Sequence, residues 1–188
     1  KDIIKSTTSF VMKDIPLYRS SEGYCFSYTP LKKDLTINAN LLAAEILASC
    51  DYVNNESNYQ DYIDEVIKFT LNNQNKNGSW YYSLDYYDKT PKKQIDFHQG
   101  YVLESLFNLK GTTTNDKLDE SIKKGLNFYY NNQFDKNGFS YWRIPSKYPI
   151  DIHNQSQGII TFSRLSKYDS KYLDFSNKIY EWTVKNMQ

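Results

Sequence analysis

The stretch FTLNNQNKNGSWYY, residues 69–82, recurs at residues 128–142 as FYYNNQFDKNGFSYW. In both copies an apolar segment ends in Asn-Asn-Gln, and a glycine among aromatic residues follows. The glutamines are 59 positions apart and the glycines 60. A partial earlier copy, GYCFSY at residues 23–28, precedes Asn38. We therefore predict one domain, residues 1–188, built from three repeat units at residues 20–75, 76–134 and 135–188.

The segments between these motifs have the apolar spacing of amphipathic helices. In residues 59–71, for example, Ile63, Val66 and Ile67 fall on one face. We predict six helices, at residues 38–52, 59–71, 98–109, 118–130, 158–168 and 172–187. Short linkers join them in pairs, which favours antiparallel hairpins. Repeated hairpins of this length build α-solenoids or closed α/α toroids. The Gly-aromatic connections favour an all-α fold, a partial α/α toroid with short aromatic-rich strands or loops between the hairpins, and six helices are half of a twelve-helix ring.

The only two histidines occupy the same short pattern, Ile95-Asp96-Phe97-His98 and Ile150-Asp151-Ile152-His153. Histidine is the commonest general acid or base and the commonest metal ligand, because its ordinary pKa lies nearest neutrality. The histidines are 55 positions apart, whereas Gly100 and Gly158 are 58 apart. We therefore expect the two histidine registers to differ by about one helical turn.

Capping explains part of this pattern. Each aspartate is a candidate N-cap of the following helix, and Asp96 with Gln99 fits a variant capping box. Capping accounts for Asp96 and Asp151 but does not require a histidine. We therefore take His98, His153, Asp96 and Asp151 as candidate catalytic residues. A structural role for both histidines stays open.

Aromatic residues around the motifs are the candidate ligand-binding residues. The chain contains 18 tyrosines, and a ring with a polar tip suits both a packed core and a wall that binds sugars. Arg143 precedes His153 by ten positions and is a candidate clamp for a carboxylate. Helix N-termini also attract anions. The predicted substrate-binding residues are Trp80, Tyr82, Tyr141, Trp142 and Arg143.

Composition argues against several classes of partner. The 23 lysines and arginines nearly balance 22 aspartates and glutamates, so we expect no nucleic-acid surface. No apolar stretch approaches the roughly 20 residues needed to span a bilayer. Cys25 and Cys50 form no CxxC pair, and we expect reduced, buried thiols.

The motifs predict no cofactor. No phosphate loop, dinucleotide fingerprint or nucleophile elbow is present. Two Asp-x-His pairs offer enough ligands for a divalent metal, but the tandem spacing of known zinc motifs is absent, so we predict no metal site. Residues 1–10 lack the apolar region of a signal peptide, so we expect a cytoplasmic protein. The chain begins with lysine rather than methionine, and we expect its natural N-terminus to be incomplete. The oligomeric state is not predicted.

Several motifs together resemble a known family. They are GYCFSYTP at residues 23–30, NANLL at 38–42, GSWYYS at 78–83, IDFHQG at 95–100 and PIDIHNQ at 149–155. They are similar to the C-terminal part of bacterial and archaeal proteins associated with surface (capsular) polysaccharide biosynthesis, often labelled delta-aminolevulinic acid dehydratase. That enzyme resembles a parallel β/α barrel with a Schiff-base lysine, whereas successive helical hairpins here leave no strand–helix alternation.

The repeats also resemble the α/α toroids of carbohydrate-active enzymes, such as sugar 2-epimerases, uronyl C5-epimerases, polysaccharide lyases and six-hairpin glycosidases. This resemblance implies a saccharide or polysaccharide precursor as partner. The leading hypothesis is proton transfer at a sugar carbon, with His98 and His153 exchanging the proton and the aspartates orienting the imidazoles. One alternative is a non-catalytic glycan-binding or scaffold module. Another is glycoside hydrolysis by Asp96 and Asp151, which requires carboxyl groups roughly 5–9.5 Å apart.

Overall fold

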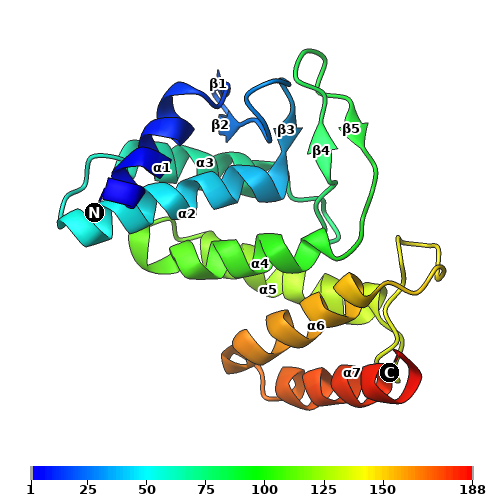
Figure 1. Cartoon of the computed structure of the whole chain (residues 1–188). Coiled ribbons are helices and arrows are strands. Elements are labelled where there is room, and N and C mark those ends of the chain that lie inside the picture. Colours follow the sequence, from blue (N-terminus) through cyan, green and yellow to red (C-terminus); the bar gives the residue numbers. More distant parts are fainter. Residues whose placement is uncertain (1, 188) are drawn as a thin grey trace.

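Seven α-helices account for most of the chain in the computed structural model, which describes residues 2–187 (Figure 1). The helices are α1 (Asp2–Lys13), α2 (Ile37–Asn54), α3 (Gln60–Asn72), α4 (His98–Asn108), α5 (Leu118–Phe128), α6 (Ile152–Arg164) and α7 (Lys171–Met187). The strands are β1 (Leu17–Ser20), β2 (Gly23–Phe26), β3 (Leu35–Thr36), β4 (Ser83–Leu84) and β5 (Pro91–Lys92). Short 3₁₀ helices follow α4 at Leu109–Thr112 and α6 at Ser166–Tyr168, and a π-helical turn follows α5 at Tyr129–Gln133. The predicted fold class, helical hairpins with short strands between them, is confirmed.

The helices form three consecutive hairpins, α2–α3, α4–α5 and α6–α7 (Figure 1). Helices α2, α4 and α6 form the inner row, because α4 packs between α2 and α6. All three begin at the end of the molecule where the connections with β3, β4 and β5 lie (Figure 1). The short strands form an antiparallel pair, β1–β2, and a three-stranded sheet in the order β3–β4–β5. This arrangement brings three helix N-termini to one surface.

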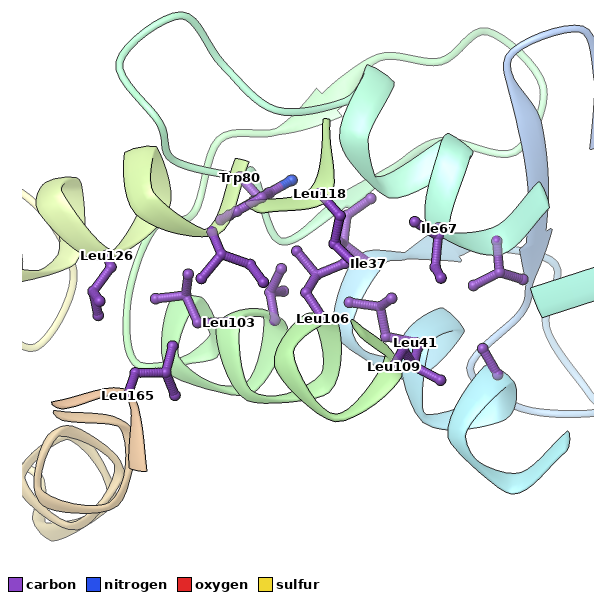
Figure 2. Packing of buried hydrophobic residues seen from close by; sticks show 14 of the residues in the cluster. Ile37, Leu41, Ile67, Trp80, Leu103, Leu106, Leu109, Leu118, Leu126 and Leu165 are labelled. Carbon is purple, nitrogen blue, oxygen red and sulfur yellow. The ribbon is translucent and has the colours of Figure 1, made fainter. Parts of the chain in front are cut away.

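The core lies between the hairpins. Figure 2 shows Leu103 and Leu106 of α4 in the same cluster as Ile37 and Leu41 of α2, and all four are buried. Burial of each such side chain contributes about 1.5–3 kcal/mol relative to exposure. Helix α2 is apolar around most of its circumference because α1, α3 and α4 all pack against it.

Each Gly-aromatic connection packs closely on the outer helix of the next hairpin. Gly23, Gly78 and Gly138 have φ angles of 123°, 96° and 93°, a region that favours glycine. A Cβ on any of them would overlap the backbone of α3, α5 or α7 respectively. The recurring glycine therefore has a structural cause that repeats from hairpin to hairpin.

An amide side chain in the first turn of each inner helix holds the same connection from the other side. The side-chain amide oxygen of each accepts a backbone N–H from the connection. Asn40 accepts from Phe26 (2.8 Å), Gln99 from Trp80 (2.8 Å) and Gln155 from Ser140 (2.7 Å). The amide nitrogens of the three side chains donate to the carbonyls of Tyr24, Trp80 and Gly138. We call Asn40, Gln99 and Gln155 the amide clamps. The capping-box interpretation of Gln99 was wrong, because its side chain bonds Trp80.

Two helix predictions were also wrong. Helix α1 was not predicted, and its buried side consists of Thr8 and Val11. Helix α6 begins at Ile152, six residues before the predicted start. Its first turns bury Asn154 and Gln155, so polar side chains occupy the inward positions where the apolar pattern was expected. Within residues 2–187, none of the helices combines the length and the apolarity that a bilayer crossing requires.

Candidate functional site

The N-terminal turns of α2, α4 and α6 form one continuous surface with the connections that precede α4 and α6. The Ile37 N–H donates to the Tyr82 carbonyl at 3.2 Å, which ties the connection after Gly78 to the start of α2. The Phe97 N–H donates to Asn154 Oδ1 at 3.2 Å, which ties the start of α4 to that of α6. Residues from all three repeat units therefore lie close together.

A buried aspartate and a histidine form the centre of this surface. Asp96 Oδ1 lies 2.6 Å from His98 Nδ1, and it also accepts the His98 backbone N–H at 3.1 Å. Asp96 Oδ2 accepts a bond from Gln94 Nε2 at 2.6 Å and lies 3.8 Å from Arg143 Nε. The side chain of His98 is 20% exposed and that of Asp96 only 3%. Because Nδ1 is engaged by Asp96, Nε2 is the ring nitrogen left for a ligand.

Two opposing effects act on the pKa of Asp96. Burial raises the pKa, but the side-chain hydrogen bond and charge of His98, its backbone N–H and the bond from Gln94 outweigh burial. The net effect lowers the pKa below its ordinary value. Asp96 is therefore ionised at neutral pH and fixes the orientation of the His98 ring.

Aromatic rings surround the exposed part of His98. Tyr82 meets its imidazole edge-on with the centroids 4.7 Å apart, and Phe97 stacks on it at 4.3 Å. Tyr101 lies at 6.0 Å. These rings leave a largely apolar setting next to the free nitrogen, in which electrostatic interactions are stronger than in water.

The phenol of Tyr82 resists ionisation. Burial raises its pKa most, and electrostatic interactions with Tyr28, Asp34 and Asp96 raise it further. Tyr82 therefore keeps its phenolic proton at neutral pH.

The second histidine lies on the rim of the same surface. His153 Nδ1 is 3.0 Å from Asp151 Oδ1, which also accepts the His153 backbone N–H at 2.9 Å. Its side chain is 70% exposed and that of Asp151 is 28% exposed. The Phe97 ring, stacked on His98, also stacks on His153 with centroids 6.0 Å apart. One ring thus touches both histidines, but only His98 is enclosed.

The two histidines are not equivalent in the repeat. Gln99 directly follows His98, whereas Gln155 comes two residues after His153. Because Gln99 and Gln155 are equivalent clamps, the counterpart of His153 is Phe97 and that of His98 is Asn154. The register difference is one residue, and the predicted difference of about one turn was wrong.

The predicted wall residue Trp80 is not part of the surface. It is 1% exposed, and its indole N–H donates to the Thr70 carbonyl at 2.9 Å. Gly125 of α5 makes room for it, because a Cβ there would come within 2.6 Å of the indole ring. Trp80 is a core residue (Figure 2).

The other predicted binding residues are partly or well exposed. Arg143 lies beside Asp96, and its guanidinium carbon is 4.3 Å from the centroid of the Trp142 ring. The Tyr141 ring contacts Phe139, with centroids 6.0 Å apart. The structure thus brings Tyr82 and Arg143 to the Asp96–His98 pair, with Trp142 behind the arginine.

Sequence reasoning missed two contributors. Phe97 occupies the unspecified position of Asp-x-His, and the only signal was that one copy has an aromatic residue there and the other Ile152. Lys92 was not considered, although its Nζ lies 4.7 Å from the centroid of the Tyr82 ring.

No cluster of three or more His, Cys, Asp or Glu side chains suited to a metal ion occurs among residues 2–187.

No protein-family model matches the chain, and no curated protein matches it in sequence. Solved structures do match. An unsaturated glucuronyl hydrolase specific for heparin superposes over 96% of this chain and 53% of its own, with 16% identity and a TM-score of 0.69. The unsaturated glucuronyl hydrolase of Bacillus sp. GL1, responsible for the degradation of glycosaminoglycan, superposes over 78% of this chain and 45% of its own, with 13% identity and a TM-score of 0.59.

The fold is a partial α/α toroid. At these identities the similarity establishes the fold alone, and the chain spans about half the length of these proteins. The resemblance to surface-polysaccharide proteins stays a prediction, because no sequence match tests it.

Proposed function

We propose that this toroid segment belongs to a carbohydrate-active enzyme that moves a proton at a sugar carbon next to a carboxylate. The observation that carries the proposal is the Asp96–His98 pair. A buried, ionised carboxylate 2.6 Å from Nδ1 holds the imidazole with Nε2 free, which is the arrangement of an oriented general base. The partial toroid adds support, since toroids of similar fold include enzymes named for acting on glucuronyl groups.

Each residue has a part in the proposed reaction. Neutral His98 Nε2 takes the proton from the carbon next to a uronate carboxylate, and the C–H electron pair moves into that carboxylate. Arg143, half-exposed beside Asp96, stabilises the added negative charge. Asp96 stabilises the imidazolium that forms.

The second proton step decides the product. Tyr82 donates its phenolic proton either to the opposite face of the carbon, which gives the epimer, or to the oxygen leaving the neighbouring carbon, which gives an unsaturated sugar by β-elimination. The sequence-based hypothesis gave this step to His153. We assign it to Tyr82, because its ring lies 4.7 Å from His98 and its phenol keeps its proton at neutral pH, whereas His153 is 70% exposed.

Glycoside or enol-ether hydrolysis is the second candidate, favoured by the hydrolase names of the similar structures. The predicted acid–base pair of Asp96 and Asp151 does not suit it. Both oxygens of Asp96 are already engaged, by His98 and by Gln94, so Asp96 is not free to donate a proton to a leaving group, whereas Asp151 engages only its Oδ1. Hydrolysis at this site would instead have His98 activate a water molecule.

The test is incubation of the protein with glucuronate-containing oligosaccharides in D2O, followed by proton NMR. Deuterium at the carbon next to the carboxylate supports epimerisation, and a vinyl proton signal supports β-elimination. A new reducing end with neither deuterium at that carbon nor a vinyl proton contradicts the leading proposal and supports hydrolysis. Binding without any chemical change contradicts both and supports a non-catalytic glycan-binding module.

The Tyr82→Phe variant tests the assigned proton donor, since it keeps the ring and removes the phenolic proton. We expect turnover to fall at least about 100-fold, the usual scale for one positioned acid or base.

A further inference from the structure

A groove beside Tyr82 carries cations that the proposed chemistry does not use. It has a volume of about 450 Å³ and lies between the loop that leads into β3 and the β4–β5 hairpin. We call it the lysine groove, lined by Lys32, Lys33, Asp34, Ser83 and Lys92 among others. Two of its lining residues, Ser83 and Lys92, are cross-strand partners in β4 and β5.

The lysines and the aspartates of the groove differ in the partners that they have. Within residues 2–187, none of Lys32, Lys33 and Lys92 forms an ion pair. Its carboxylates instead accept backbone N–H groups: Asp34 from Tyr28, Asp85 from Tyr87 and Asp88, and Asp88 from Thr90. Residues 30–36 and 82–94 together contain five lysines and three aspartates. The groove lining itself has three lysines and three aspartates, and Lys89 and Lys93 in the flanking segments bring the local net charge to +2.

Two of these ammonium groups lie against tyrosine rings. Lys92 Nζ is 4.7 Å from the Tyr82 centroid, and Lys33 Nζ is 5.4 Å from the Tyr86 centroid. A ring face packs on the apolar side of a sugar, while an adjacent ammonium group pairs with its acidic substituent. This combination suits an anionic saccharide better than a free anion or a neutral sugar.

One residue, Tyr82, links the groove to the Asp96–His98 pair. Tyr82 directly precedes Ser83 of the groove lining, and its ring centroid lies 4.7 Å from Lys92 Nζ and 4.7 Å from the centroid of the His98 ring. A sugar bound at His98 would therefore direct its neighbour along the chain into the groove.

We infer that the lysine groove binds the acidic group of the sugar unit adjacent to the one at His98. The ligand is then an oligosaccharide or polysaccharide that carries carboxylates or sulfates on successive units. This inference rests on the proposed function for its reference point, the sugar at His98.

The experiment is titration calorimetry of the full chain with three hexasaccharides: a uronate oligomer, a sulfated oligomer and a neutral glucose oligomer. The variant is Lys33→Ala/Lys92→Ala. The matched control is Lys5→Ala/Lys123→Ala, which removes the same charge from exposed positions on α1 and α5. We expect the groove variant to bind the anionic hexasaccharide about tenfold more weakly than the wild type and with a weaker salt dependence, while the control stays within about twofold.

Every outcome bears on the groove. Tighter binding of the uronate or of the sulfated oligomer shows whether the groove binds carboxylates or sulfates. Either preference supports the inference if the groove variant no longer shows it. Equal binding of the neutral oligomer, equal losses in both double variants, or no binding of either anionic oligomer to the wild type overturns it. Turnover that is unchanged by the lysine substitutions refutes the groove and leaves the proposed function standing. Binding that depends on the lysines but is not followed by turnover supports the groove and contradicts the proposed function.

Discussion

The two Ile-Asp-x-His motifs have the same local geometry and very different surroundings. In both, the aspartate accepts the backbone N–H of the histidine and contacts its Nδ1. Around Asp96 the chain adds Gln94, Arg143 and Tyr82, and the side chain is 3% exposed. Asp151 is 28% exposed and its histidine 70%. The motif therefore sets a helix start with an oriented imidazole, and tertiary packing decides which copy is fit for chemistry.

The largest expected difference in stability is between variants of the two aspartates. Asp96→Ala leaves the Gln94 amide and two donors of His98 without their acceptor at a buried site, which should lower the free energy of unfolding by about 3 kcal/mol. Asp151→Ala removes a more exposed cap and should cost about 1 kcal/mol. Urea denaturation of both variants measures the two values. Equal losses would show that the two sites do not differ as described.

The amide clamps should not show this asymmetry. Gln99→Ala and Gln155→Ala each remove two bonds to buried backbone, so both should lower the free energy of unfolding by about 2 kcal/mol. The exposed Asn131→Ala is the control, expected within about 0.5 kcal/mol of wild type. If only Gln99→Ala lowered the free energy of unfolding, the whole α6 unit, and not only its histidine, would be weakly packed.

The smallest expected effect is the dependence of stability on acid. The pKa of Asp96 is lower in the folded chain than its unfolded value of about 3.9, so its stabilisation is complete above that pH and is lost as the pH falls through the folded value. Asp96→Asn cannot titrate. The difference in unfolding free energy between wild type and Asp96→Asn should therefore shrink as urea titrations move from about pH 6 to about pH 3. A difference that stays constant over this range would argue against an ionised Asp96 in the folded state.

The repeat could be predicted from the sequence because its causes are local. Gly78 and Gly138 must approach a helix backbone with positive φ, and only glycine does this without overlap. The same constraint recurs in each unit, so the spacing of the glycines indicated the hairpin repeat.

The site was harder to predict because its causes are not local. Trp80 lies in the same Gly-aromatic connection as Tyr82, so the sequence placed both at the binding surface. Gly125, 45 positions after Trp80, instead makes the space in which the Trp80 ring is buried. The histidines looked equivalent because Asp-x-His recurs, but the clamp positions Gln99 and Gln155 place them one residue out of register. Neither fact is visible until the helices pack.

The central claim is that His98 performs the proton transfer and His153 does not. The most direct measurement is kcat/KM of His98→Gln and His153→Gln on a uronate oligosaccharide that the wild type turns over. Glutamine retains polar atoms near the ring position and cannot act as a base at neutral pH. The account predicts a loss of at least about 1000-fold for His98→Gln and less than about tenfold for His153→Gln. Losses of similar size in both variants, or a fully active His98→Gln, would contradict it.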